Sequence, residues 1–318
     1  MTSGLILALD YGGTKHTAGV VAAGERDWRA RRQAPATAGG NADADRASMS
    51  ALAREVLAGQ TPLAIGVSFG GPVDYPSGTV RLSHHVPGWE AVPLARLLEA
   101  EFGAPAWVDN DANVAALGEH RFGAGQGCDS LMYITVSTGV GGGWILNGQP
   151  WRGQDGMAGE IGHTVVDPLG PVCLCGKRGC VERLASGPYL AQRARDLLAQ
   201  DAERGSTLRA MAGDDWGALD ARLVAAAAAR GDELALSVLH EAGRALGVGI
   251  GNAANLVNPR RFVLGGGVTK SGEVFWQAVR QAARETALPQ VLFDIVPATL
   301  GDEAPLWGAV ALTDAAQA

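Results

Sequence analysis

Three times along the chain a short apolar run ends in a glycine-rich turn, and this repeated unit constrains the fold more than any other feature. The runs lie at residues 5–9, 131–136 and 261–264, and the turns that follow lie at 12–13, 139–143 and 265–267. Runs of this length are typical of buried strands. The helical patterns between them predict an α/β fold with largely buried sheets. The recurrence of the unit indicates two related lobes with a central cleft.

The length of the chain also favours two lobes, because 318 residues exceed what one hydrophobic core usually organises. We expect a small lobe at 1–113, with a helix at 304–318 that packs back on it, and a large lobe at 114–303. Within the large lobe, residues 203–216 have the composition of a surface linker between two helices.

The formal net charge of −7 disfavours binding to nucleic acid or to an anionic membrane, since both require a basic face. The first residues lack the basic segment and the long apolar run of a signal peptide. No window of the sequence is long and apolar enough for a transmembrane helix. We therefore expect a cytoplasmic protein.

The glycine turns predict anion binding, because successive backbone N–H groups after a strand form a concavity that attracts negative charge. The first turn adds a carboxylate for Mg²⁺ at Asp10, a hydroxyl at Thr14 and a cation at Lys15. Together the three turns would line one nucleotide site, although each turn alone is equally compatible with a hairpin. No P-loop sequence occurs, and a G-x-G-x-x-A match at 249–254 lies inside a helical pattern, which argues against a dinucleotide fold.

A second candidate site is the segment Asp-Asn-Asp-Ala-Asn at 109–113, where a predicted strand meets a predicted helix. A kinase needs one carboxylate to accept the proton of the attacking hydroxyl, and a neighbouring amide can orient the substrate. Asp and Asn are also the residues preferred at a helix N-cap, without any chemistry. The spacing alone does not separate these two interpretations.

A third candidate site is a cysteine cluster, since Cys173, Cys175 and Cys180 follow His163 closely. One His and three Cys form the ligand set of a structural zinc site, which has no open position for catalysis. A redox dithiol is disfavoured because no C-x-x-C occurs, and a cluster of reactive thiols is the remaining alternative.

The predicted zinc would order the loop that carries His163 and the carboxylates Glu160 and Glu182. Buried carboxylates that accept hydrogen bonds from hydroxyls are a good way to select a polyol, because an unmatched acceptor is costly. The alternative for both glutamates is a pair of solvated surface charges.

The chain resembles the ROK family (repressor, open reading frame, kinase) of bacterial sugar kinases, and its glucokinase-like members most closely. The matching segments are LALDYGGTK at 7–15, VDNDANVAALGE at 108–119, TVSTGVGGGWILNG at 135–148, GEIGH at 159–163, CLCGKRGCVE at 173–182 and FVLGGGV at 262–268. This resemblance implies an actin-like ATPase fold of the ribonuclease H type, with two lobes and a central cleft. It also implies ATP-dependent phosphorylation of a hexose, most simply glucose, with ATP, Mg²⁺ and structural Zn²⁺, in a homodimer.

The resemblance assigns roles residue by residue, with Asp111 as the catalytic base. The nucleotide positions are Asp10, Gly12, Gly13, Thr14, Lys15, Thr138, Gly139, Gly141, Gly265, Gly266 and Gly267. The sugar positions that we assign are Gly71, His85, Asn110, Asp111, Glu160, His163 and Glu182. The zinc ligands are His163, Cys173, Cys175 and Cys180.

One departure concerns the sugar, because His85 stands before Pro-Gly-Trp where the family usually has Asn. An N-acetylated hexose, such as N-acetylmannosamine or N-acetylglucosamine, and fructose are therefore alternatives to glucose. A sugar-sensing regulator without catalysis is the alternative from another class. Repressors of the family carry a DNA-binding domain before the first loop, which begins here at Asp10, so we expect no nucleic-acid partner.

Overall fold

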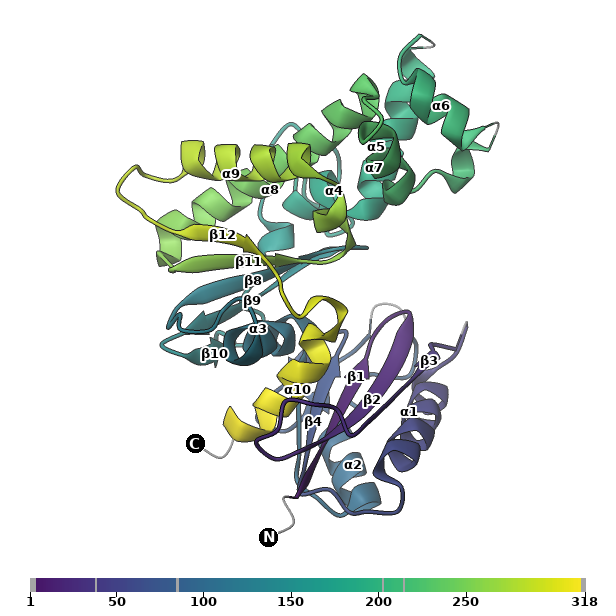
Figure 1. The fold of residues 1–318 in the computed structure, drawn as a ribbon, viewed down its shortest axis with the longest axis vertical. Coiled ribbons are helices and arrows are strands. Elements are labelled where there is room, and N and C mark those ends of the chain that lie inside the picture. Colours follow the sequence, from purple (N-terminus) through teal and green to yellow (C-terminus); the bar gives the residue numbers. More distant parts are fainter. Residues whose placement is uncertain (1–3, 38, 84–85, 202, 214, 316–318) are drawn as a thin grey trace. The chain divides into compact units, whose positions relative to one another are not determined.

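The computed structural model describes residues 4–37, 39–83, 86–201, 203–213 and 215–315, and its frame is two five-stranded sheets (Figure 1). The first sheet has the order β3-β2-β1-β4-β7, and the second has the order β10-β9-β8-β11-β12. Numbered from its own first strand, each sheet reads 3-2-1-4-5. The repeat inferred from the glycine turns is therefore a repeat of the whole sheet topology.

The strands are β1 Leu5–Tyr11, β2 Lys15–Ala22, β3 Ala30–Pro35, β4 Ala64–Phe69, β5 Val73–Asp74, β6 Thr79–Val80, β7 Ala106–Asn110, β8 Leu131–Val136, β9 Val140–Leu146, β10 Gln149–Trp151, β11 Arg261–Gly265 and β12 Asp294–Pro297. The helices are α1 Ala42–Leu57, α2 Leu94–Phe102, α3 Asp111–Phe122, α4 Val181–Ala185, α5 Gly187–Gln200, α6 Ser206–Ala212, α7 Ala221–Ala228, α8 Glu233–Val257, α9 Glu273–Thr286 and α10 Ala304–Ala315. Short 3₁₀ turns are η1 Ile161–His163, η2 Trp216–Ala218, η3 Gly267–Lys270 and η4 Gly301–Glu303.

The chain forms two compact units. The first unit contains the described residues up to Tyr133, residues 143–158 and those from Ala298 onward. The second unit contains residues 134–142 and 159–297. These bounds differ from the lobes predicted at 1–113 and 114–303, because α3 and most of β9 and β10 group with the first unit.

In the first unit, the sheet is covered on one face by α1 and α2, whose apolar side chains share a buried cluster with strands β1, β2, β4 and β7. Helix α10 lies against β4 and β1. It approaches β4 so closely that a Cβ added to Gly66 would lie 1.8 Å from the carbonyl oxygen of Ala309. Glycine at position 66 is therefore what allows α10 to pack on the sheet.

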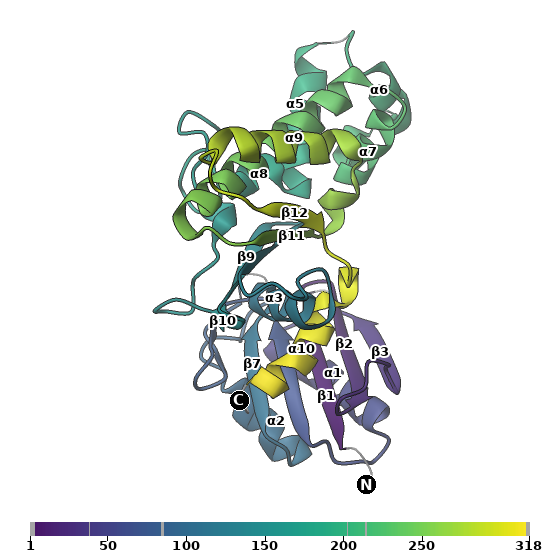
Figure 2. The ribbon, with the colours of Figure 1, turned by 60° about the vertical axis from the view of Figure 1, so that its left-hand side comes forward.

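Helices α3 and α10 lie side by side, as Figure 2 shows. Glycines again allow the two helices to approach closely. A Cβ on Gly308 would lie 1.8 Å from the carbonyl oxygen of Val114, and one on Gly118 would lie 2.4 Å from that of Ala304. The segment before α10 is tied to α3 by the buried carboxylate of Glu119, which accepts from the backbone N–H groups of Thr299 and Leu300 at 3.2 and 2.8 Å.

In the second unit, α8 and α9 are packed through a glycine stripe on α8. A Cβ on Gly243, Gly247 or Gly251 would lie within 2.8 Å of α9 backbone or side-chain atoms. The G-x-G-x-x-A match at 249–254 is thus helix packing, as expected. Among the described residues, no helix combines the length and the apolar character needed to span a bilayer.

Two local expectations were wrong. The glycine turn predicted at 139–143 is mostly strand, because β9 already begins at Val140 and Gly141 lies in it. The stretch 203–216 is not only a linker, since it contains helix α6 with Leu208 fully buried.

Candidate functional site

The carboxyl ends of three parallel strands in the first unit gather polar side chains at one sheet edge. Asp10 on β1 lies opposite Ser68 on β4, which lies opposite Asp109 on β7. Ser68 donates its hydroxyl to Asp10 Oδ1 at 2.8 Å, and both side chains are buried. Edges of this kind are where ligands bind in α/β sheets.

Burial raises the pKa of Asp10 to about 7, and the negative charge of Asp111 adds to the shift. The Ser68 hydroxyl and the Lys15 ammonium oppose it but do not cancel it. A buried carboxyl with a raised pKa is stabilised in its charged form when a cation approaches. Asp10 is therefore suited to meet a metal ion.

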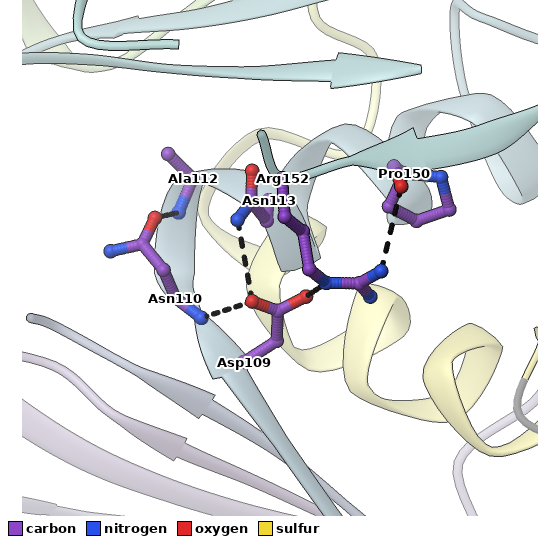
Figure 3. Close-up of polar contacts among 6 residues, drawn as sticks. All are labelled: Asp109, Asn110, Ala112, Asn113, Pro150 and Arg152. Atoms are coloured by element: carbon purple, nitrogen blue, oxygen red, sulfur yellow. Dashed lines mark hydrogen bonds and ion pairs between the residues drawn. The ribbon is translucent and has the colours of Figure 1, made fainter. Parts of the chain in front are cut away.

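The Asp109–Asn110–Asp111 segment lies where β7 passes directly into α3, and Figure 3 shows Asp109 and Asn110 at this junction. Asn110 is the N-cap of the helix, and its Oδ1 accepts from the N–H of Ala112 at 3.0 Å. Asp111 is the first helical residue, where the positive end of the helix dipole favours its charge. The same N–H also donates to Asp111 Oδ1 at 2.8 Å, so Asn110 and Asp111 share this contact at the start of the helix.

The neighbours of this junction are backbone groups of the turn after β4. Asn110 Nδ2 donates to the carbonyl oxygen of Gly71 at 3.1 Å. Asp111 Oδ2 lies beside Gly70, 3.8 Å from where a Cβ of that residue would be. Gly71 and Asn110, both assigned to the sugar, are thus brought together. His85 lies outside the described residues.

The first glycine turn connects β1 to β2 as a hairpin, and Lys15 begins the second strand. Gly12 is required there, since a Cβ would lie 2.9 Å from the carbonyl oxygen of Lys15. Gly13 and Thr14 are exposed, so their backbone can be reached by a ligand.

The second and third turns line one cavity of about 700 Å³ in the second unit. Thr138 comes from the turn between β8 and β9, and Gly267 comes from the turn after β11. Gly266 has a φ of +90° and lies so close to Val136 that a Cβ would be 2.4 Å from its carbonyl oxygen. The second and third turns therefore border one cavity, which has room for a nucleoside-sized ligand. The first turn does not line this cavity and belongs to the first unit.

The rest of that cavity is formed by residues that sequence reasoning missed. They include Arg195 on α5, Asp220 and Arg222 at the start of α7, and Lys270 at the end of η3. No motif marks them, because they come from separate helices and become neighbours only when the fold forms. Arg195 is held in place by a bond from Nη1 to the carbonyl oxygen of Leu219 at 2.8 Å.

The two glutamates assigned to the sugar differ in their surroundings. Glu182, on α4, accepts from the backbone N–H of Val140 at 3.0 Å through Oε2. That oxygen also lies 2.7 Å from where a Cβ of Gly139 would be, so Glu182 packs against the second glycine turn. Glu160 is exposed and directly precedes η1, which carries His163.

The four predicted zinc ligands converge, with their ligand atoms all within 4.8 Å of one another. Cys175 Sγ lies 3.5 Å from Cys180 Sγ, and Cys173 Sγ lies 3.9 Å from His163 Nδ1. Edges of this length match a tetrahedron around an ion with Zn–S bonds of about 2.3 Å. The donor set therefore fits zinc, with Nδ1 as the coordinating nitrogen of His163.

Comparisons with known proteins agree with this geometry. The sequence profile of the ROK family matches residues 6–316. A glucokinase of Halalkalibacterium halodurans is 42% identical over 248 residues, which are 77% of this chain and 74% of that protein. A glucokinase of Thermotoga maritima is 31% identical over 309 residues, 96% of each chain. A ROK family glucokinase from Streptomyces griseus, solved with glucose and AMPPNP, has a TM-score of 0.83 at 33% identity, covering 99% of this chain and 100% of that one.

Proposed function

The chain belongs to the ROK family, and from that membership we propose that it is an ATP-dependent glucokinase. Its fold is the actin-like ATPase fold that the resemblance implied, and several relatives that match along nearly the whole chain are glucokinases or hexokinases. The observation that carries the proposal is the position of Asp111, on the edge that also holds the buried carboxyl of Asp10.

Asp111 acts as the general base in this proposal. It accepts the proton of the primary hydroxyl of glucose while that oxygen attacks the γ-phosphorus of ATP, and ADP leaves with the electron pair of the broken P–O bond. Asn110 and the Gly71 carbonyl, which already share a hydrogen bond, face the sugar. His85, Glu160, His163 and Glu182 complete the proposed sugar contacts.

The nucleotide is assigned to the glycine turns. The cavity lined by Thr138 and Gly267 takes the nucleoside, and the backbone of Gly12 to Lys15 and of Gly139 takes phosphates. Asp10 is the candidate ligand for Mg²⁺, which when bound would neutralise negative charge on the phosphates. Gly141, which lies in strand β9, is also assigned to the nucleotide site. Gly265 and Gly266 are assigned to it as part of the third turn.

The zinc site has a structural role in this proposal. With His163 Nδ1 facing Cys173, the other ring nitrogen is left to face substrate, so one residue links the metal loop to sugar recognition. Since four protein ligands fill a tetrahedral ion, the site orders the loop and takes no part in the chemistry.

The test is an ADP-release assay with purified protein, ATP and a panel of hexoses. Glucose is expected to give the highest kcat/KM, and glucose 6-phosphate is expected as the product. A higher kcat/KM for N-acetylmannosamine, N-acetylglucosamine or fructose would identify that sugar, in place of glucose, as the substrate. Sugar binding without ADP release for any hexose would favour a sensor instead. A homodimer and a cytoplasmic location stay predictions, which sizing chromatography and cell fractionation would test.

A further inference from the structure

Beside the proposed base lies a buried ion pair that the proposed mechanism does not use (Figure 3). Arg152 Nε donates to Asp109 Oδ2 at 2.7 Å. The side chain of Asp109 is 3% exposed and that of Arg152 is 19% exposed, so the pair is largely removed from water. A buried pair of this kind is a weak source of stability but is costly to break by removing one partner.

The other oxygen of Asp109 is bound within the strand–helix junction itself. Its Oδ1 accepts from the backbone N–H of Asn110 at 2.8 Å and from Asn113 Nδ2 at 3.3 Å. One carboxylate therefore fixes the residue just before Asp111 and a residue in the first turn of α3. Its geometry depends on both oxygens acting as acceptors.

Arg152 is itself held from two sides. Its guanidinium carbon lies 3.5 Å from the centroid of the Tyr75 ring, in the turn between β5 and β6. Its Nη1 donates to the carbonyl oxygen of Pro150 at 3.4 Å. A planar guanidinium can stack on a ring and donate to a carboxylate at once, which an ammonium cannot do. Arg152 thus joins the β5–β6 turn, the end of β10 and the β7–α3 junction.

The ionised form of Asp109 is less favourable without Arg152 beside it. Burial is the largest influence on this carboxyl and raises its pKa, while Arg152 is the first of the groups that oppose the rise. Removing Arg152 would raise this pKa further, because burial would then be opposed by fewer groups. Oδ2 would then have lost its donor, so the carboxyl group would be free to turn and would carry Oδ1 away from the Asn110 N–H and Asn113 Nδ2. Asn110 and Asp111 would shift with it.

We propose that Arg152 is a positioning residue for phosphoryl transfer, which acts by pairing with Asp109 and thereby fixes the direction of Asn110 and Asp111. The inference rests on the proposed function, since it assigns Arg152 a part in that reaction. In this proposal Arg152 acts through Asp109 and not on the substrate itself.

The test compares Arg152→Met, Arg152→Lys and Asp109→Asn with the wild type in the ADP-release assay with glucose, from pH 6 to 9. Arg152→Met is expected to lower kcat by about 10- to 100-fold, the usual effect of a small misplacement of a reacting group, with a smaller change in KM for glucose. Arg152→Lys keeps a cation beside Asp109 but loses the planar group that stacks on Tyr75, so it is expected to recover only part of the loss. Arg32→Met, which removes an exposed pair with Glu55, is the matched control and should resemble the wild type.

The pH profile separates positioning from a purely structural role. The ratio of kcat in Arg152→Met to that of the wild type should rise with pH, because loss of Arg152 raises the pKa of Asp109 further and a higher pH favours its charged form. The titratable groups that face Asp109 among the described residues are Arg152 and Tyr75, and burial raises the pKa of Tyr75, so its phenol stays neutral over this range. Asp109→Asn cannot regain charge, and its lowered kcat ratio should stay flat.

Three results would overturn the proposal: wild-type kcat in Arg152→Met, wild-type kcat in Asp109→Asn, or a lowered ratio in Arg152→Met that does not change with pH. If Arg152→Met does not fold, Arg152→Lys and Asp109→Asn are compared with the wild type instead. Wild-type kcat in both variants would then overturn the proposal. A wild-type protein that releases no ADP with any hexose refutes the proposed function, and this proposal with it. If the wild type phosphorylates a hexose and Arg152→Met has the same kcat, only the role of Arg152 is refuted.

Discussion

Replacing Asp10 by Asn is expected to stabilise the nucleotide-free protein while it abolishes phosphoryl transfer. The carboxyl is buried and its pKa is raised to about 7, so ionising it in the folded protein is unfavourable. Asn has the same shape and can still accept from the Ser68 hydroxyl, which donates to Asp10 in the wild type. The variant therefore removes a buried charge without emptying its site.

The size of the effect follows from linkage between folding and protonation. A raised pKa means that the protonated carboxyl stabilises the folded state below pH 3.8, and that this stability is lost as pH rises through about 7. A shift from 3.8 to about 7 corresponds to up to about 4 kcal/mol at pH 8. The advantage of Asp10→Asn should grow from near zero at pH 4 to that limit at pH 8.

Urea unfolding at several pH values, followed by tryptophan fluorescence, measures this difference. The signal reports mainly on the unit that holds Asp10, because it contains Trp28, Trp89, Trp107, Trp144, Trp151 and Trp307. Asp27→Asn, on an exposed carboxylate, is the control and should show no trend with pH. The reasoning fails if Asp10→Asn is no more stable than the wild type at pH 8, or if its advantage is the same at pH 5 and pH 8.

Three further outcomes are expected. Asp111→Asn should lower kcat by roughly 10²- to 10⁴-fold, the usual contribution of a positioned base, while calorimetry shows glucose binding retained; near-normal turnover would exclude Asp111 as the base. Metal analysis should find about one zinc per chain, lost in Cys175→Ser but kept in Cys128→Ala, whose thiol lies outside the cluster; an active, metal-free wild type would contradict this. Gly308→Ala should destabilise the first unit by about 1–3 kcal/mol or more, because its Cβ would lie 1.8 Å from a backbone oxygen of α3; an unchanged urea midpoint would contradict the packing of α10.

The sequence was most informative where function and local structure depend on the same residues. The strand-and-glycine pattern predicted β1, β8 and β11 and the turns after them, because a buried strand and a tight turn both leave strong local signals. The cysteine cluster was predicted as a metal site from spacing, and its ligand atoms do converge. The extent of the second turn was wrong, because the Gly141–Gly143 run that marks a turn is here tolerated within strand β9.

The contacts that hold the site in place could not be read from the sequence. Arg152 and Asp109 are 43 residues apart, and nothing in either segment indicates the other. Ser68 is the penultimate residue of β4, whose sequence is that of an ordinary buried strand, yet its hydroxyl donates to Asp10. Glu182 was assigned to the sugar, and its bond to Val140 was not foreseen, since it depends on how α4 packs against the turn. Such pairs form only in the tertiary structure, so patterns among neighbouring residues of the sequence do not reveal them.

The packing of α10 against β1 and β4 also sets an order of events during synthesis. The first unit needs Gly66 on β4 and Ala309 on α10 to meet, yet residues 159–297 of the second unit are made between them. On the ribosome, that long segment is made before α10, so much of it can begin to fold before the last helix of the first unit is available. Until α10 packs, the face of β1 and β4 that it covers stays exposed, and apolar surface exposed during folding is prone to aggregation.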